Sequence, residues 1–149
     1  MKQRLWVSLL IGLIGIYLVM AGIGKILEPI SVYRVLEFDG IHQKMVKYYI
    51  VLLLSFYEVL LGFWIILRRN TFLPCLIAAL TFIGFFVQNG MIIAFDGPSL
   101  CGCLGYFKWM LPEFSAKIGG ITNGIISSIL LYQLYLIKKA HDHTHHHMS

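Results

Sequence analysis

The chain has 149 residues, of which 58% are hydrophobic and only 13% are charged. This composition excludes a water-soluble domain of this size and predicts an integral membrane protein. A spanning helix needs about 20 apolar residues, so about four spans fit, with no room for a separate soluble domain. The net charge of +5 is carried by the flanks of the apolar stretches, without a basic and aromatic pattern, so we expect no nucleic acid partner.

Four apolar stretches are long enough to cross a bilayer. They run over about residues 5–23, 48–67, 72–95 and 114–137. The first is too long for the apolar region of a signal peptide, so it is taken as a span. Backbone groups in lipid must pair within their own segment, which favours helices. The sequence therefore predicts an all-α membrane protein, a four-helix bundle over residues 1–140 followed by a disordered, histidine-rich tail at 141–149.

A short interfacial helix is predicted between the first and second spans. Apolar residues alternate there with charged ones, at Ile30, Tyr33, Val35, Leu36 and Phe38. Pro29 is a plausible start signal, and Asp39-Gly40 is a plausible stop. Two interpretations stay open: the helix lies passively at the bilayer edge, or it forms a lid or docking face.

The basic residues beside the spans predict the orientation. Equal numbers flank the two sides, but Arg68 and Arg69 lie in a tight connection, and the loops on the opposite side also carry acidic residues. We therefore expect both termini in the cytoplasm of a bacterial cell and the loop after the third span in the periplasm. Cys75, near the inner start of the third span, is expected to be a packed hydrophobic residue.

The periplasmic loop contains the most distinctive motif of the chain, Cys101-Gly102-Cys103. Three interpretations compete. Two cysteines one residue apart close a very small disulfide ring, and strained or exposed disulfides are typically labile, which favours redox exchange. A fixed clip gains little from closing so short a loop. Two thiolates could also hold a soft metal ion with further ligands.

Polar residues inside the spans are candidate functional groups, because they are costly in lipid. Glu58 falls near the bilayer midplane, while Gln88, Asn89 and Asn123 form a polar layer toward the outer side. The amides could equally well join the helices by hydrogen bonds. Lys25, at the outer end of the first span, is a candidate partner for Glu58. At about 1.5 Å per residue the two lie at different depths, so contact needs a shortened first helix or a long lysine reach.

The histidine tail is a second candidate metal site. Its residues His143, His145 and His147 could bind zinc, nickel or copper. With four spans, the tail and the Cys101 and Cys103 pair lie on opposite sides of the membrane, so they cannot share one ion. A metal-handling protein that uses both groups remains an alternative to a redox protein.

Three motifs stand out along residues 5–137: Ala21-Gly22-Ile23-Gly24-Lys25-Ile26-Leu27-Glu28-Pro29, Glu58 to Gly62, and Cys101-Gly102-Cys103-Leu104-Gly105. In these motifs the chain resembles the family of the methylamine utilisation protein MauE, within the wider DoxX-like group of four-helix membrane proteins. Two positions depart from the family pattern. Leu104 stands where an aromatic residue is common, and Ser55-Phe56-Tyr57 lacks the proline often found ahead of the glutamate.

The resemblance implies disulfide chemistry outside the membrane with a thioredoxin-like partner, during maturation of exported proteins. DoxX-like relatives include subunits linked to quinone reduction, so a quinone is a candidate cofactor. On this hypothesis the chain is a thiol-disulfide oxidoreductase with Cys101, Cys103, Glu58 and Lys25 as catalytic residues. The layer of Gln88, Asn89 and Asn123 would hold the quinone headgroup. A non-catalytic docking subunit of a larger membrane complex is a further alternative, and the direction of electron flow stays open.

Overall fold

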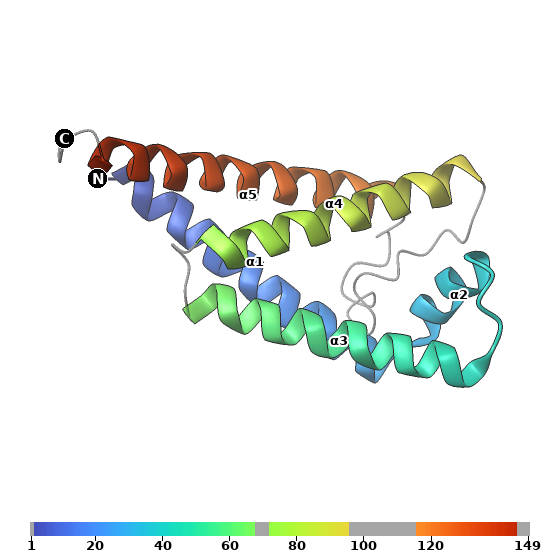
Figure 1. The fold of residues 1–149 in the computed structure, drawn as a ribbon. Helices are drawn as coiled ribbons and strands as arrows, with labels where there is room; N and C mark the ends of the chain where they lie inside the picture. Colours follow the sequence, from blue (N-terminus) through green and yellow to red (C-terminus); the bar gives the residue numbers. More distant parts are fainter. Residues whose placement is uncertain (1, 68–71, 96–115, 146–149) are drawn as a thin grey trace.

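The computed structural model describes residues 2–67, 72–95 and 116–145. The described part of the chain contains five helices and no strand (Figure 1). The helices are α1 (Lys2–Leu27), α2 (Ile30–Phe38), α3 (Lys44–Leu67), α4 (Phe72–Ala94) and α5 (Ala116–His145).

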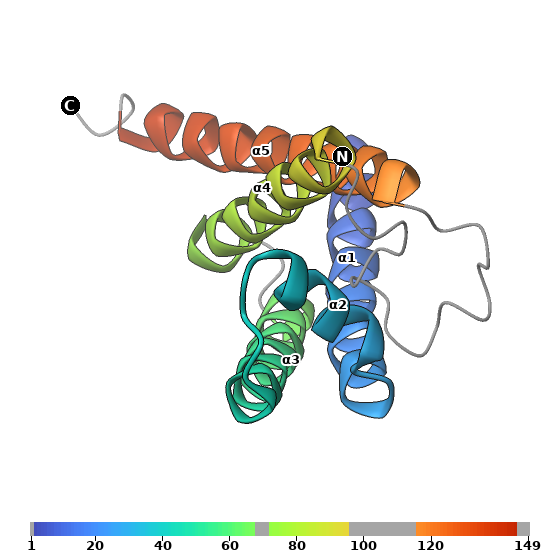
Figure 2. The ribbon, with the colours of Figure 1, turned by 90° about the vertical axis from the view of Figure 1, so that its right-hand side faces the viewer.

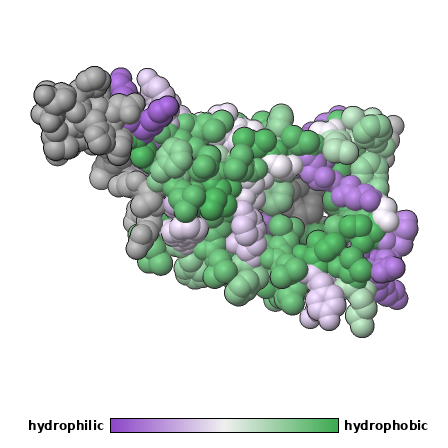
Figure 3. Space-filling view, in the orientation of Figure 1, coloured by the Kyte–Doolittle hydropathy of each residue, from purple (hydrophilic) through white to green (hydrophobic). Residues whose placement is uncertain are grey.

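All of these helices except α2 are long and apolar enough to cross a membrane. At 24 residues, α3 is about 36 Å long, which exceeds the hydrocarbon thickness of about 30 Å. Apolar side chains cover the middle of the face shown in Figure 3, and hydrophilic residues gather toward its two ends. The predicted fold is confirmed: the protein is a multi-pass, four-helix membrane bundle with a short helix between its first and second spans.

The four long helices form two antiparallel pairs. α1 packs along α3 and α4 packs along α5, whereas contacts between the two pairs are far fewer. The start of α1 and the end of α5 lie at one end of the bundle, which we call the end with the termini, and α2 lies at the other (Figures 1 and 2). α4 ends at the α2 end, and α5 begins toward it. The segment that carries Cys101 and Cys103 therefore starts and finishes at the α2 end, although its own path lies outside the described residues.

The bounds of α2 follow from its flanking residues. α1 ends at Leu27, because the next residue, Glu28, precedes Pro29, and a residue before proline disfavours helical geometry. Pro29 then caps the start of α2, and its carbonyl accepts the first helical bond, from the amide of Tyr33, at 2.9 Å. At the other end Gly40 adopts a φ of 86°, and the amide of Ile41 donates to the carbonyl of Leu36 at 2.8 Å. This is a Schellman stop, in which glycine takes the left-handed conformation without strain.

Glycines bring α1 and α3 into direct backbone contact. A Cβ on Gly62 would lie only 2.6 Å from the carbonyl oxygen of Gly15, and one on Gly22 would lie 2.7 Å from the carbonyl oxygen of Ser55. Real Cβ atoms do not approach other atoms so closely. The absence of side chains at these positions therefore sets the spacing of the pair, as small residues do in other membrane helices.

The hydrophobic core occupies the half of the bundle nearer the termini. It is built from all four long helices, by Ile11, Ile14, Leu18, Leu61, Ile65, Cys75, Ala78, Ala79, Phe82, Leu130 and Leu134. Cys75 is fully buried in it, which confirms that this cysteine is a packed hydrophobic residue. The half nearer α2 contains most of the buried polar side chains instead.

Three helices extend beyond the spans expected from the sequence. α3 begins at Lys44 rather than at residue 48. α1 reaches Leu27 rather than residue 23, so the first helix is not shortened. α5 continues through His145 and so includes the first five residues of the predicted disordered tail. Hydropathy predicts only the apolar part of a helix. The backbone hydrogen bonds continue into the flanking polar sequence until a residue interrupts them, so the helix is longer than its apolar part.

Candidate functional site: a buried ion pair beside a cavity

A buried ion pair joins α1 and α3 in the α2 half of the bundle. The Nζ of Lys25 donates to Oε1 of Glu58 at 2.8 Å and to Oε2 at 2.6 Å. The exposed fractions of the two side chains are 2% and 0%. A charged side chain in the membrane is costly unless it is paired, so each group makes the burial of the other tolerable.

The two side chains meet because both lean toward the gap between them. The contact of Gly22 with Ser55 places Lys25 about 9 Å nearer the α2 end than Glu58, at 1.5 Å per residue. Side chains tilt toward the start of their own helix, and α1 and α3 are antiparallel. Lys25 therefore points back into the bundle while Glu58 points toward the α2 end. A long lysine reach, rather than a shortened helix, closes the distance.

An aromatic ring and a buried hydroxyl group lie close to the ion pair. The Nζ of Lys25 lies 5.6 Å from the centre of the Phe85 ring on α4, within the range of a cation–π interaction. Close by on α3, the hydroxyl of Ser55 is fully buried and makes no hydrogen bond to any residue that the structure describes. Ser55 also stands directly opposite Gly22, so a larger side chain there would push against α1.

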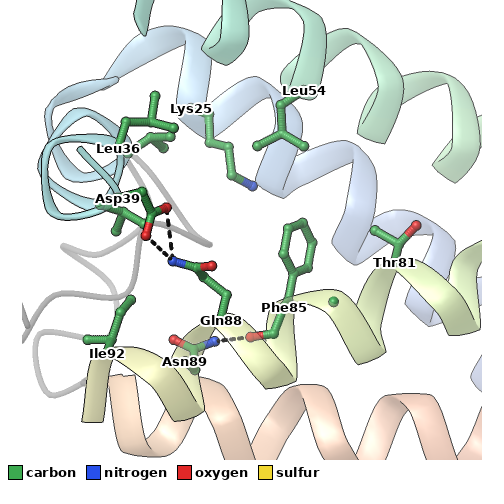
Figure 4. Close-up of a pocket in the computed structure, with 12 residues that line it drawn as sticks. Lys25, Leu36, Asp39, Leu54, Thr81, Phe85, Gln88, Asn89 and Ile92 are labelled. Carbon is green, nitrogen blue, oxygen red and sulfur yellow. Dashed lines mark hydrogen bonds between the residues drawn. The ribbon is translucent and has the colours of Figure 1, made fainter. Parts of the chain in front are cut away.

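A cavity of about 280 Å³ lies beside Lys25, between the two helix pairs and beneath α2. Its lining comes from α1, α2, α3 and α4, and consists of Lys25, Val32, Val35, Leu36, Asp39, Leu54, Thr81, Gly84, Phe85, Gln88, Asn89 and Ile92. Figure 4 shows the Lys25 side chain reaching from α1 toward the ring of Phe85, with Gln88 and Asn89 on the α4 side. The site thus combines an apolar wall with a charged group and two amides.

Two polar contacts hold α2 over this cavity. Lys47 of α3 forms an ion pair with Glu37, and its Nζ lies 5.7 Å from the centre of the Tyr33 ring. On the other side, the Nε2 of Gln88 on α4 donates to both carboxylate oxygens of Asp39, at 3.1 Å each (Figure 4). α2 is therefore attached to α3 and, through Asp39 directly after its end, to α4, and these two helices belong to opposite helix pairs.

The contact between Lys47 and Glu37 makes the docking of α2 sensitive to acid. The hydrogen bond from Lys47, and then its charge, hold the pKa of Glu37 below its ordinary value. In the unfolded chain the pKa of a glutamate is about 4.3, and in the folded protein the pKa of Glu37 is lower. The stability that this difference contributes is fully present above about pH 4.3 and is lost as the pH falls through the pKa of the folded state. We expect hydrogen exchange in α2, corrected for intrinsic rates, to accelerate in that acidic range. Glu37→Gln should abolish this pH dependence, and an equal acceleration in the variant would contradict the assignment.

The structure brings together only part of the predicted site. Lys25, Gln88 and Asn89 line one cavity, and Glu58 lies behind Lys25 as its ion-pair partner. Asn123 is buried on α5, a helix that contributes none of the described residues lining the cavity.

The structure does not describe the predicted thiol and metal sites. Cys101, Cys103 and His147 lie outside the described residues, and so do the side chains of His143 and His145. Among the side chains that are described, no group of three His, Cys, Asp or Glu residues could hold a metal ion.

Sequence reasoning missed three contributors to the site. Asp39 is predicted from the sequence as part of a helix stop and as one of the acidic loop residues, although an acidic residue at the end of a short helix over the bundle is also a signal for a polar contact below it. Phe85 and Thr81 carried no signal, because aromatic and hydroxyl residues are common in spans. Thr81 is joined to Tyr57 of α3 by a hydrogen bond of 2.6 Å between their hydroxyl oxygens, which links the two helix pairs.

A four-span bundle, a buried lysine–glutamate pair and a cavity under a short helix define a polytopic membrane protein with a polar site in the half of the bundle nearer α2. The family model for the methylamine utilisation protein MauE matches residues 2–136, so the chain belongs to the MauE family. No curated protein and no solved structure matches the chain significantly.

Proposed function

We propose that the protein exchanges electrons through Cys101 and Cys103 with a thioredoxin-like protein of the periplasm, in support of the maturation of exported proteins. On this proposal it is a thiol-disulfide oxidoreductase of the bacterial inner membrane with both termini in the cytoplasm. The observation that carries the proposal is the coincidence of three features at one end of the bundle. The segment with the two cysteines is attached there, and the buried ion pair and the cavity lie in the same half.

The orientation is supported by the basic residues. In the sequence, Arg68 and Arg69 connect α3 to α4, and α3 ends and α4 begins toward the end of the bundle where α1 begins. An excess of basic residues in short loops is typical of the cytoplasmic side. The opposite end would then face the periplasm, where disulfides form and persist.

The exchange itself balances without a cofactor. A thiolate of the partner attacks one sulfur of the Cys101–Cys103 disulfide, a mixed disulfide forms, and the second cysteine leaves as a thiolate. The partner's other thiolate then attacks the mixed disulfide and releases the reduced pair. Two electrons pass from the partner's dithiol to Cys101 and Cys103, and the reverse sequence oxidises the pair again.

The ion pair is neutral as a whole, but its positive end, the ammonium of Lys25, is the part that borders the cavity. A nearby ammonium favours a thiolate over a thiol, so Lys25 would lower the pKa of a cysteine that approached it. Glu58 holds the lysine in place and, with Asn89, would manage protons in this half of the bundle.

Alkylation of thiols in isolated membranes tests the redox proposal. We expect a fraction of the molecules to hold Cys101 and Cys103 as a disulfide. In that fraction a mass-tagged maleimide should add to the two cysteines only after a reductant has been applied. Replacing one of the two by serine should leave the other able to trap the partner as a mixed disulfide that a reductant dissolves. Cys75→Ala is the matched control, since this buried cysteine belongs to the core and should affect neither result. Cysteines that never change state under either condition would contradict the proposal.

A further inference from the structure

The cavity beneath α2 has the lining of a ligand-binding site. Most of its wall surface is apolar, and its hydrophobic lining residues are Val32, Val35, Leu36, Leu54, Phe85 and Ile92. Its polar lining residues are Lys25, Asp39, Thr81, Gln88 and Asn89. A mostly apolar cavity with a few placed polar groups is the usual form of a site for a small molecule. At about 280 Å³ it exceeds the roughly 150 Å³ of a cavity that holds benzene.

The charges of the lining select an uncharged ligand. The ammonium of Lys25 is already balanced by Glu58, and the carboxylate of Asp39 is held by Gln88. An anion would compete with Glu58 and be repelled by Asp39, whereas a cation would be repelled by Lys25. A net charge would also be costly against the apolar walls.

The ligand should carry an oxygen that accepts hydrogen bonds. An ammonium group is a donor only, so the ligand atom that faces Lys25 must be an acceptor. The amides of Gln88 and Asn89 provide further polar contacts at the same cavity. A carbonyl group on an otherwise apolar molecule meets both requirements.

Gly84 keeps the cavity open on the side of α4. It lines the cavity, and a Cβ built on it would meet no atom within 4 Å. A larger residue at this position would therefore project into free space rather than into the packed bundle. Gly90, six residues later on the same helix, has equally open surroundings but is not among the described lining residues. The two glycines form a matched pair for a test.

We propose that this cavity binds the headgroup of an uncharged, lipid-soluble carbonyl compound, with the carbonyl oxygen toward Lys25. Two sources of this chemistry exist in a membrane, a neutral acylglycerol lipid and a lipophilic quinone. The proposal does not depend on the thiol chemistry, because none of the described lining residues is a cysteine.

Photolabelling of the full chain in lipid nanodiscs tests the proposal. Three probes carry the same diazirine-bearing alkyl tail: a monoacylglycerol, an alkylated benzoquinone and a plain alkane. We expect at least one carbonyl probe to label α2 or α4 about tenfold more than the alkane, which corresponds to about 1.4 kcal/mol. Labelling by the monoacylglycerol probe identifies a neutral lipid as the ligand, and labelling by the benzoquinone probe identifies a quinone. Equal labelling by all three probes overturns the proposal.

Filling the cavity gives the second arm of the test. Gly84→Leu should reduce labelling by the carbonyl probe about tenfold, while Gly90→Leu should leave it unchanged. Val35→Phe fills the same cavity from α2, and this variant replaces Gly84→Leu in the test if Gly84→Leu does not fold. Equal labelling in the cavity-filling variants and in Gly90→Leu overturns the site. Replacing Cys101 and Cys103 by serine should leave labelling intact, which separates this proposal from the redox proposal.

Discussion

Glu58→Leu alone is expected to destabilise the protein by about 3–5 kcal/mol, because it leaves the ammonium of Lys25 buried without its counter-charge. Lys25→Met alone should have a similar effect through the carboxylate. The double variant Lys25→Met with Glu58→Leu should recover most of the loss, since two apolar side chains of similar size need no pairing. Unfolding of the purified protein by a denaturing detergent measures the differences in free energy.

The second ion pair of the structure provides the control. Glu37 is half exposed, and Glu37→Gln should change stability far less than Glu58→Leu, because exposed ion pairs contribute little. A double variant as unstable as either single variant would contradict a simple charge-pairing role for Lys25 and Glu58. If the double variant folds but no longer exchanges thiols, the pair acts in the chemistry as well as in the fold.

Gly62→Ala is expected to destabilise the protein by about 1–3 kcal/mol through overpacking, and Gly62→Leu by more. The added Cβ would lie 2.6 Å from the carbonyl oxygen of Gly15 and 2.7 Å from Cγ2 of Val19, so α1 and α3 must separate. Separation would also stretch the Lys25–Glu58 contact, which depends on the spacing of this helix pair. Thermal unfolding in detergent, followed by circular dichroism, measures the effect.

Gly90→Ala is the matched control for this prediction. Its Cβ meets nothing within 4 Å, so it should be neutral or slightly stabilising, as alanine has the better helix propensity. Equal losses in Gly62→Ala and Gly90→Ala would mean that the close approach of α1 and α3 does not limit stability. A second-site change of Val19 to alanine should recover part of the loss in Gly62→Ala, because it removes one of the two clashing groups.

The buried ion pair shows how far sequence reasoning reached into the site. The unfavourable position of Glu58 in an apolar span marked it as functional or paired, and Lys25 was the candidate partner. Counting residues along the helices suggested different depths, since the rise of a helix locates Cα atoms and not the ends of long side chains. The antiparallel pairing and the opposite tilt of the two side chains brought them together.

The cavity and most of its lining residues could not be predicted from the sequence. Gln88 and Asn89 were visible as polar residues in a span, but Asn123 has the same appearance and lies on a helix that does not line the cavity. Hydropathy gives the depth of a polar residue and not the direction it faces around the bundle. Asp39 and Phe85 line one cavity only because the fold places α2 over α4.

The sequence by itself determined the membrane class, the number of spans, the short helix between the first two spans and its stop at Asp39-Gly40. These features depend on local composition and on the backbone preferences of single residues, which act over a few positions. Only the tertiary structure decided that α1 pairs with α3 and α4 with α5, that Lys25 meets Glu58, and that α2 covers a cavity. These features depend on contacts between residues more than 30 positions apart, which are set by the fit of glycine-rich helix faces against one another.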